Sequence, residues 1–182
     1  DISAFIPVAP GLVAHYTMDE TDGAALIDAS GFGRAGTYQD TNGVLTLNQE
    51  PLAAGRSAMF TEGALAEIGP GVLPVFENFS VSLWANLGEA NSASSIVSRG
   101  DGAGDPFALL WFSAGDQALV AEEALTLGQT HHLMAVVDGN QVTVYVDGVS
   151  VGTESIVTFA DNANNSLQLG AANGILGING RL

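Results

Sequence analysis

The chain has 182 residues, of which 47% are hydrophobic and only 13% charged, so it can bury a sizeable core and is not a disordered tail. Its 20 acidic residues oppose four arginines and no lysine, and the net charge of −16 repels nucleic-acid phosphates and anionic membrane surfaces. Cysteine is absent, which excludes disulfides and thiol chemistry. No apolar run reaches the roughly 18 residues that would span a bilayer. We therefore expect no nucleic-acid partner and no membrane insertion.

In the N-terminal part of the chain, a short lead-in, one strand and one loop are predicted. Residues 1–10 are expected to be a lead-in or an edge strand, because Pro7 and Pro10 interrupt regular pairing. A first clear strand is predicted over residues 12–18, and a glycine-rich loop over residues 28–36.

A series of short strands is predicted in the rest of the chain. They cover residues 44–47, 58–60, 64–68, 79–86, 95–98, 107–113, 117–121 and 166–170. In the strand over residues 79–86, Phe79, Val81 and Leu83 occupy one face. Trp84 falls on the other face, which then also needs cover, and we expect both Phe79 and Trp84 to pack in the core.

The segment over residues 128–149 carries the clearest strand signal. Valines alternate with polar residues over residues 141–146, and an apolar run precedes them. Asp-Gly pairs at residues 138–139 and 147–148 are typical hairpin turns between such runs. Since no long helical period occurs, we predict a single all-β domain built as an antiparallel sandwich of two sheets.

Several motifs, taken in order, resemble the laminin G-like domains of the concanavalin A-like lectin and glucanase family. The matching motifs are Tyr16-Thr17-Met18-Asp19-Glu20, Asp28-Ala29-Ser30-Gly31-Phe32-Gly33, Phe79-Ser80-Val81-Ser82-Leu83-Trp84, His131-His132, and Tyr145-Val146-Asp147-Gly148. Each motif is weak alone, but together they cover residues 11–182. The resemblance implies an antiparallel two-sheet jelly-roll sandwich.

The chain departs from the family pattern in two places. The family usually has a tryptophan just before its histidine pair, where this chain has Thr130. The family also continues past its last Gly-x-Leu motif with an acidic pair and a closing strand, whereas this sequence stops at Leu182. We expect a domain over residues 11–182 whose closing strand is absent or is supplied by residues 1–6, an acidic residue followed by alternating apolar ones.

A calcium site is predicted at the start of the domain. Asp19, Glu20 and Asp28, with carbonyl oxygens around Gly31, offer the hard oxygen ligands that calcium prefers. Laminin G-like domains often hold calcium, so the resemblance implies the same cofactor. In the alternative interpretation, Asp28 and Ser30 simply form turns beside glycine.

Ligand contacts are predicted at two carboxylates and two aromatic rings. Asp101 and Asp105 lie in a glycine-rich loop, a position at which jelly-roll lectins contact ligands. Trp111 and Tyr38 could stack on sugar rings. The alternatives are a solvated loop tip for the carboxylates and core packing for the aromatic residues.

Two adjacent pairs, of histidine and of glutamate, are candidates for metal binding or catalysis, but their positions fit these roles poorly. His131 and His132 are adjacent on a predicted strand and should point to opposite faces, so we expect one in the core and one at the surface. Glu122-Glu123 lacks the spacing of the paired carboxylates that glycoside hydrolysis needs. We therefore expect a protein that is not an enzyme.

The resemblance implies a non-catalytic, calcium-assisted module that binds a glycan or another cell-surface ligand. It would belong to a larger multidomain protein that is secreted or displayed on the cell surface, of bacterial type. A structural or adhesive module without sugar binding is the alternative. A polysaccharide hydrolase or lyase is the third possibility, and its motif is missing.

Overall fold

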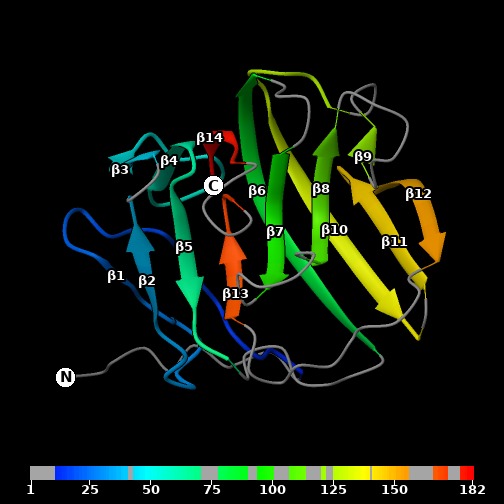
Figure 1. The fold of residues 1–182 in the computed structure, drawn as a ribbon, viewed down its shortest axis with the longest axis horizontal. Helices are drawn as coiled ribbons and strands as arrows, with labels where there is room; N and C mark the ends of the chain where they lie inside the picture. Colours follow the sequence, from blue (N-terminus) through cyan, green and yellow to red (C-terminus); the bar gives the residue numbers. More distant parts are fainter. Residues whose placement is uncertain are drawn as a thin grey trace.

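The computed structural model shows an all-β sandwich of two sheets (Figure 1). It describes residues 11–40, 43–70, 78–89, 94–100, 107–113, 120–121, 125–139, 141–155, 166–171 and 177–182. Within these ranges there is no helix long and apolar enough to cross a membrane.

Among the described residues, each sheet has seven strands. The first, which we call the β13 sheet, has the order β1 (Ala25–Leu26), β2 (Gly36–Gln39), β5 (Leu65–Ile68), β13 (Ser166–Leu169), β7 (Ser94–Gly100), β8 (Phe107–Ser113) and β9 (Val120–Ala121). The second, the β6 sheet, has the order β12 (Val149–Ser155), β11 (Gln141–Val146), β10 (Thr130–Asp138), β6 (Asn78–Glu89), β14 (Asn179–Arg181), β4 (Ser57–Glu62) and β3 (Gly43–Gln49). The pairs are antiparallel apart from the short β8–β9 pair. The predicted fold class is confirmed.

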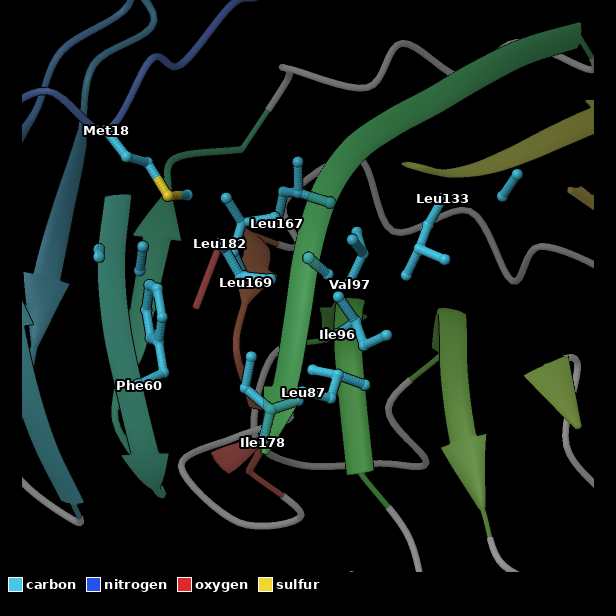
Figure 2. Packing of buried hydrophobic residues seen from close by; sticks show 14 of the residues in the cluster. Met18, Phe60, Leu87, Ile96, Val97, Leu133, Leu167, Leu169, Ile178 and Leu182 are labelled. Carbon is cyan, nitrogen blue, oxygen red and sulfur yellow. The ribbon is translucent and has the colours of Figure 1, made fainter. Parts of the chain in front are cut away.

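The core lies between the two sheets and is filled from both. Along β11, Val142, Val144 and Val146 are buried, whereas the residues between them are partly exposed. In Figure 2, Phe60 lies between the sheets, and Met18 reaches in from the N-terminal segment toward Leu167. Burying side chains of this size contributes about 1.5–3 kcal/mol each, so the alternation fixes which face of each strand points outward.

The predicted double hairpin is confirmed as β10, β11 and β12. Its second turn places Asp147 and Gly148 at φ +50° and +79°, as a tight two-residue turn requires. β10 also pairs with β6 over nine consecutive positions, from Thr130 opposite Asn86 to Asp138 opposite Asn78. This continuous ladder holds the outward side chains of β6 and β10 on a rigid surface.

The strand predicted over residues 12–18 is not a regular strand. Among the described residues, only Tyr16 in this segment forms a bridge, and its partner is Asp28. Met18 is nevertheless buried, and Ala14 and Tyr16 pack against the core, so side-chain packing holds the segment in place. Residues 1–10, with the pairing predicted for residues 1–6, lie outside the described residues.

Candidate functional site

The Asp28 carboxylate stabilises the glycine-rich loop through hydrogen bonds to backbone N–H groups. Its Oδ1 accepts hydrogen bonds from the backbone N–H groups of His15 (3.1 Å) and Ser30 (2.9 Å), and its Oδ2 accepts one from that of Arg34 (3.0 Å). Burial acts to raise the pKa of Asp28, but the hydrogen bonds from Ser30 and from these backbone groups outweigh it and lower the pKa from 3.8 to about 2. Gly31 continues the turn at φ +83°. The carboxylate therefore acts as a turn former.

The same loop is tied to the N-terminal segment. The Tyr16 hydroxyl donates to the Arg34 carbonyl oxygen at 2.6 Å, and the Arg34 guanidinium donates to the Val13 carbonyl oxygen. Burial, with a further contribution from the Asp28 charge, raises the pKa of Tyr16 to about 12 against the opposing effect of Arg34. These bonds explain why residues 12–18 keep their place without a strand partner on each side.

Asp19 and Glu20 bind other donors. Asp19 Oδ1 accepts from the Arg56 backbone N–H at 2.6 Å. Glu20 accepts from the Ile27 backbone N–H at 2.8 Å and from the Tyr38 hydroxyl at 3.0 Å. The acidic pair therefore anchors separate parts of the chain.

Tyr38 is a core residue. Its side chain is only 5% exposed, and its ring centroid lies 6.5 Å from that of Phe60. Burial, followed by the neighbouring Glu20 carboxylate, raises the pKa of its hydroxyl. The ring therefore fits the alternative of core packing, and its predicted ligand contact has no support from this placement.

The described carboxylates do not fit the calcium site predicted for them. Across the described ranges, no three His, Asp or Glu residues gather closely enough to hold a metal ion. Asp19, Glu20 and Asp28 each accept hydrogen bonds from protein donors instead, and Gly31 belongs to the turn around Asp28. Calcium binding elsewhere in the chain remains a prediction.

Replacing Asp28 with alanine should destabilise the domain by about 1–2 kcal/mol near neutral pH, because three backbone N–H groups lose their acceptor. The folded-state pKa lies below the unfolded value, so the stabilisation is complete above pH 3.8 and is lost as the pH falls toward about 2. Urea denaturation across this range should show wild type and variant converging. The exposed Asp22, replaced in the same way, is the control. A gap that stays constant at low pH would contradict this role.

The histidine pair divides between the two faces, as predicted. His131, whose side chain is 13% exposed, approaches Asp147 Oδ2 through Nδ1 at 2.7 Å, and its Nε2 accepts from the Thr126 backbone N–H at 3.1 Å. Because Nε2 is an acceptor, the proton resides on Nδ1. The hydrogen bond from His131 lowers the pKa of Asp147. His131 therefore has a structural role, because it links the Thr126 backbone to Asp147. Of the pair, His132 is the residue that points to the outer surface of the sheet.

Trp84 is the feature of this surface that the sequence interpretation missed. Its side chain is 46% exposed, so the expectation that it packs in the core is wrong. It lies directly opposite His132 in the β6–β10 ladder, and the two ring centroids are 5.1 Å apart with planes tilted by 56°. One signal was present in the sequence: Trp84 shares its face of the strand with Ser80 and Ser82, and both serines are exposed.

The outward side chains around Trp84 form a mixed apolar and polar surface that we call the Trp84 face. Its members project from β6, β10 and β11 and are Ser80, Ser82, Trp84, His132, Met134, Val136, Thr143 and Tyr145. The serines are exposed, and Thr143 exchanges a hydroxyl hydrogen bond of 3.0 Å with Thr153. An indole bordered by hydroxyls can stack on the apolar face of a sugar ring and bond its hydroxyls.

A groove of about 1180 Å³ borders this face, and we call it the β6 groove. One wall is the N-terminal segment over residues 11–19, another is the loop over residues 52–57, and a third is β6 from Asn78 to Trp84. Leu167, Leu169 and Leu182 form its apolar floor. The volume is large enough for a small oligosaccharide or an extended peptide segment.

The remaining predicted ligand contacts are not tested. Asp101 and Asp105 lie outside the described residues. Trp111 belongs to β8, where its backbone pairs with that of Ser95, but its side chain is outside the described part of the chain. Their roles in ligand binding remain predictions.

The two packed antiparallel sheets define a jelly-roll sandwich domain. A family model described as the concanavalin A-like lectin/glucanases superfamily matches residues 60–182, and the chain belongs to this family. The resemblance seen in the sequence motifs is thereby confirmed. Comparison with curated proteins gives no match.

Solved structures share the fold at low sequence identity. Domain 4 of AbnA, a GH43 extracellular arabinanase from Geobacillus stearothermophilus solved with arabinotriose, is 22% identical, with a TM-score of 0.67 over 93% of this chain and 88% of that chain. Trypanosoma rangeli sialidase is 14% identical, with a TM-score of 0.61 over 90% of this chain and 28% of that one. The botulinum neurotoxin type G receptor-binding domain is 13% identical, with a TM-score of 0.54 over 88% and 44%. At these identities the likeness concerns the fold alone.

Proposed function

We propose that this protein is a non-catalytic glycan-binding module whose ligand lies on the Trp84 face. The observation that carries the proposal is the half-exposed Trp84 ring beside His132, with hydroxyl groups on the same rigid sheet surface. Membership of a lectin and glucanase superfamily supports it. The extracellular arabinanase domain, a structural neighbour seen with arabinotriose, supports a sugar ligand and a place within a larger secreted or surface protein.

The composition of the Trp84 face favours binding over hydrolysis. Retaining glycosidases place two carboxyl groups about 5 Å apart across the scissile bond, and inverting enzymes place them somewhat further apart. No member of the Trp84 face is acidic. A sugar on this surface would meet an aromatic ring and hydroxyl groups, which bind and orient it without supplying an acid or a nucleophile.

Trp84→Ala should weaken glycan binding by about 30-fold, the equivalent of roughly 2 kcal/mol for a central aromatic contact. A glycan array would identify ligands, with arabinotriose as the first probe because a structural neighbour was solved with it. Titration calorimetry would then compare wild type, Trp84→Ala and Trp84→Phe. We expect phenylalanine to retain part of the affinity, because it keeps a ring at this position.

Phe32→Ala is the matched control for the array and the titration. Phe32 is also an exposed aromatic residue, at 56%, but it lies in the glycine-rich loop and outside the Trp84 face. Its replacement should leave glycan affinity unchanged. If wild type binds no glycan, or binds equally well after Trp84→Ala, the proposed function is wrong.

If calcium binds at residues other than Asp19, Glu20 and Asp28, as is still predicted, its removal should lower both glycan affinity and melting temperature. A cation at 100-fold above its dissociation constant would stabilise the fold by about 2.7 kcal/mol, an effect that thermal melting with and without EDTA detects easily. A melting temperature that is unchanged in EDTA would contradict the calcium prediction.

A structural or adhesive module is the second candidate. The β6 groove favours it, because an apolar groove beside a sheet edge can accept a strand from a protein segment. Absence of glycan binding on the array, together with full stability of the purified domain, would favour this second function.

A further inference from the structure

The β6 sheet is incomplete among the described residues. On one side, β6 pairs with β10 along its whole first part. On the other side, β14 pairs only as far as Arg181 opposite Asn86, so the same register places Leu182 opposite Ala85. Beyond that point, no described strand pairs with residues 80–84 on the β14 side of β6. Edges of this kind accept an additional strand readily.

The β6 groove runs along this open stretch. Leu182 lines it, and both backbone hydrogen bonds of Leu182 to Ala58 are formed at 3.0 Å, so the last residue of the β14 segment is fixed at the groove. Gly11, the first described residue, also lines the groove. In Figure 1 the dark-blue segment, which is the first described part of the chain, and the start of β6 both lie toward the lower side of the view.

The groove walls match an extended segment with one apolar face. The inward side chains of β6 on this stretch are Val81 and Leu83, which are partly buried and pack against the core. Met18, Leu167 and Leu169 face the same space from other elements. A strand seated here would bury alternate side chains against the core and leave the others on the outside.

We propose that residues 1–6 of this chain occupy the β6 groove as an added strand, antiparallel to β6. Ile2, Ala4 and Ile6 give the segment one apolar face. Six residues span about 20 Å in a strand, which is enough to cover the open stretch over residues 80–84. Residues 7–10, with two prolines, form the turn that connects the strand to Gly11.

The register follows from β14. If Asp1 takes the position after Leu182, it lies opposite Trp84, which sets Ile2 opposite Leu83 and Ala4 opposite Val81. In this register Ile2 and Ala4 point toward the core with Leu83 and Val81, and Asp1 points outward beside Trp84. Because side chains alternate, Ser3 and Phe5 fall on the same side as the Trp84 face and extend it.

Cysteine pairing tests this placement directly, because the natural chain contains no cysteine. The variant Ala4→Cys with Val81→Cys should form a disulfide within one chain on mild oxidation, since directly opposite residues meet the distance that a disulfide needs. Peptide mapping by mass spectrometry and size-exclusion chromatography would detect the bond and show whether the protein is monomeric.

Three matched pairs define the outcome. Ser3→Cys with Val81→Cys places the thiols on opposite faces, and Ala4→Cys with Val44→Cys uses the far edge strand β3, so neither should close. Ala4→Cys with Leu83→Cys reports a register shifted by two residues. If neither Val81 nor Leu83 pairs with Ala4, or if the disulfide joins two chains, the proposal is overturned.

Thermal melting of the otherwise unaltered chain gives a second readout that needs no thiol. Ile2→Asp should lower the melting temperature by about 5 °C or more, because it drives a charge against the core. Ser3→Asp, on the outward face, should leave it nearly unchanged. Equal melting of both variants and wild type would also overturn the placement, whether or not the protein binds a glycan.

Discussion

Replacing Phe60 with alanine is expected to destabilise the domain by about 3–5 kcal/mol. Phe60 has no exposed surface and lies in β4 at the centre of the core. Its ring contacts Tyr38, and Gly170 approaches the ring so closely that a methyl group there would meet it at 2.6 Å. The packed surroundings cannot collapse fully into the space that the ring leaves, so both the lost burial and the cavity contribute to the cost.

The matched control for Phe60→Ala is Phe32→Ala, which removes the same atoms from a side chain that is 56% exposed. The guanidinium of Arg34 lies 5.5 Å from the centre of the Phe32 ring, an exposed contact of about 0.5–1 kcal/mol. Urea denaturation should therefore separate the two variants by several kcal/mol. Similar losses at both positions would show that Phe60 is not the centre of the core.

Gly177→Ala should cost about 3 kcal/mol or more, although it adds only a methyl group. A Cβ atom at Gly177 would overlap the carbonyl oxygen of Glu62. Glu62 is held at φ +56°, and its backbone N–H donates to the Asn179 side chain at 3.1 Å. The atom that the new methyl group would meet therefore belongs to the Glu62 backbone, whose position is held by its own turn and by the hydrogen bond to Asn179. It cannot move away as the end of a flexible side chain could.

Gly69→Ala is the control for this second substitution. A Cβ atom at Gly69 would meet no heavy atom within 4 Å, and its φ lies outside the left-handed region. We expect a change within about 0.5 kcal/mol, because surface substitutions away from special backbone positions have little effect. Thermal and urea denaturation of both variants check the prediction. A mild effect of Gly177→Ala would show that the turn after β4 can move away.

The parts of the fold that the sequence predicted are those with local causes. The hairpins of β10, β11 and β12 depend on Asp-Gly turns and on alternation within a few residues, and both features can be read along the chain. The order of the strands cannot be read in this way. β13 lies between β5 and β7, and β4 and β5 belong to different sheets although only two residues separate them.

The candidate site was harder to predict because its chemistry depends on neighbours distant in sequence. Asp28 has the composition of a calcium ligand, but its oxygens accept backbone hydrogen bonds, and only the loop path reveals this. The same reason explains the two aromatic residues: Tyr38, which was considered as a ligand contact, is buried, and Trp84, which was expected in the core, is exposed. Whether an aromatic side chain on a strand is covered depends on which elements pack over it, and for Trp84 the two serines on its face were the only local indication.

The open edge of β6 has a consequence for the behaviour of concentrated protein. If residues 1–6 occupy the groove as we propose, two copies could pair edge to edge and begin to aggregate whenever these residues leave it. Many proteins protect such edges with lysine, which this chain lacks, but its charge of −16 makes copies repel one another. That repulsion reaches about 10 Å at 0.1 M salt and about 3 Å at 1 M. We therefore expect the domain to resist aggregation at low salt and to aggregate more readily at about 1 M salt, where the repulsion between copies is screened.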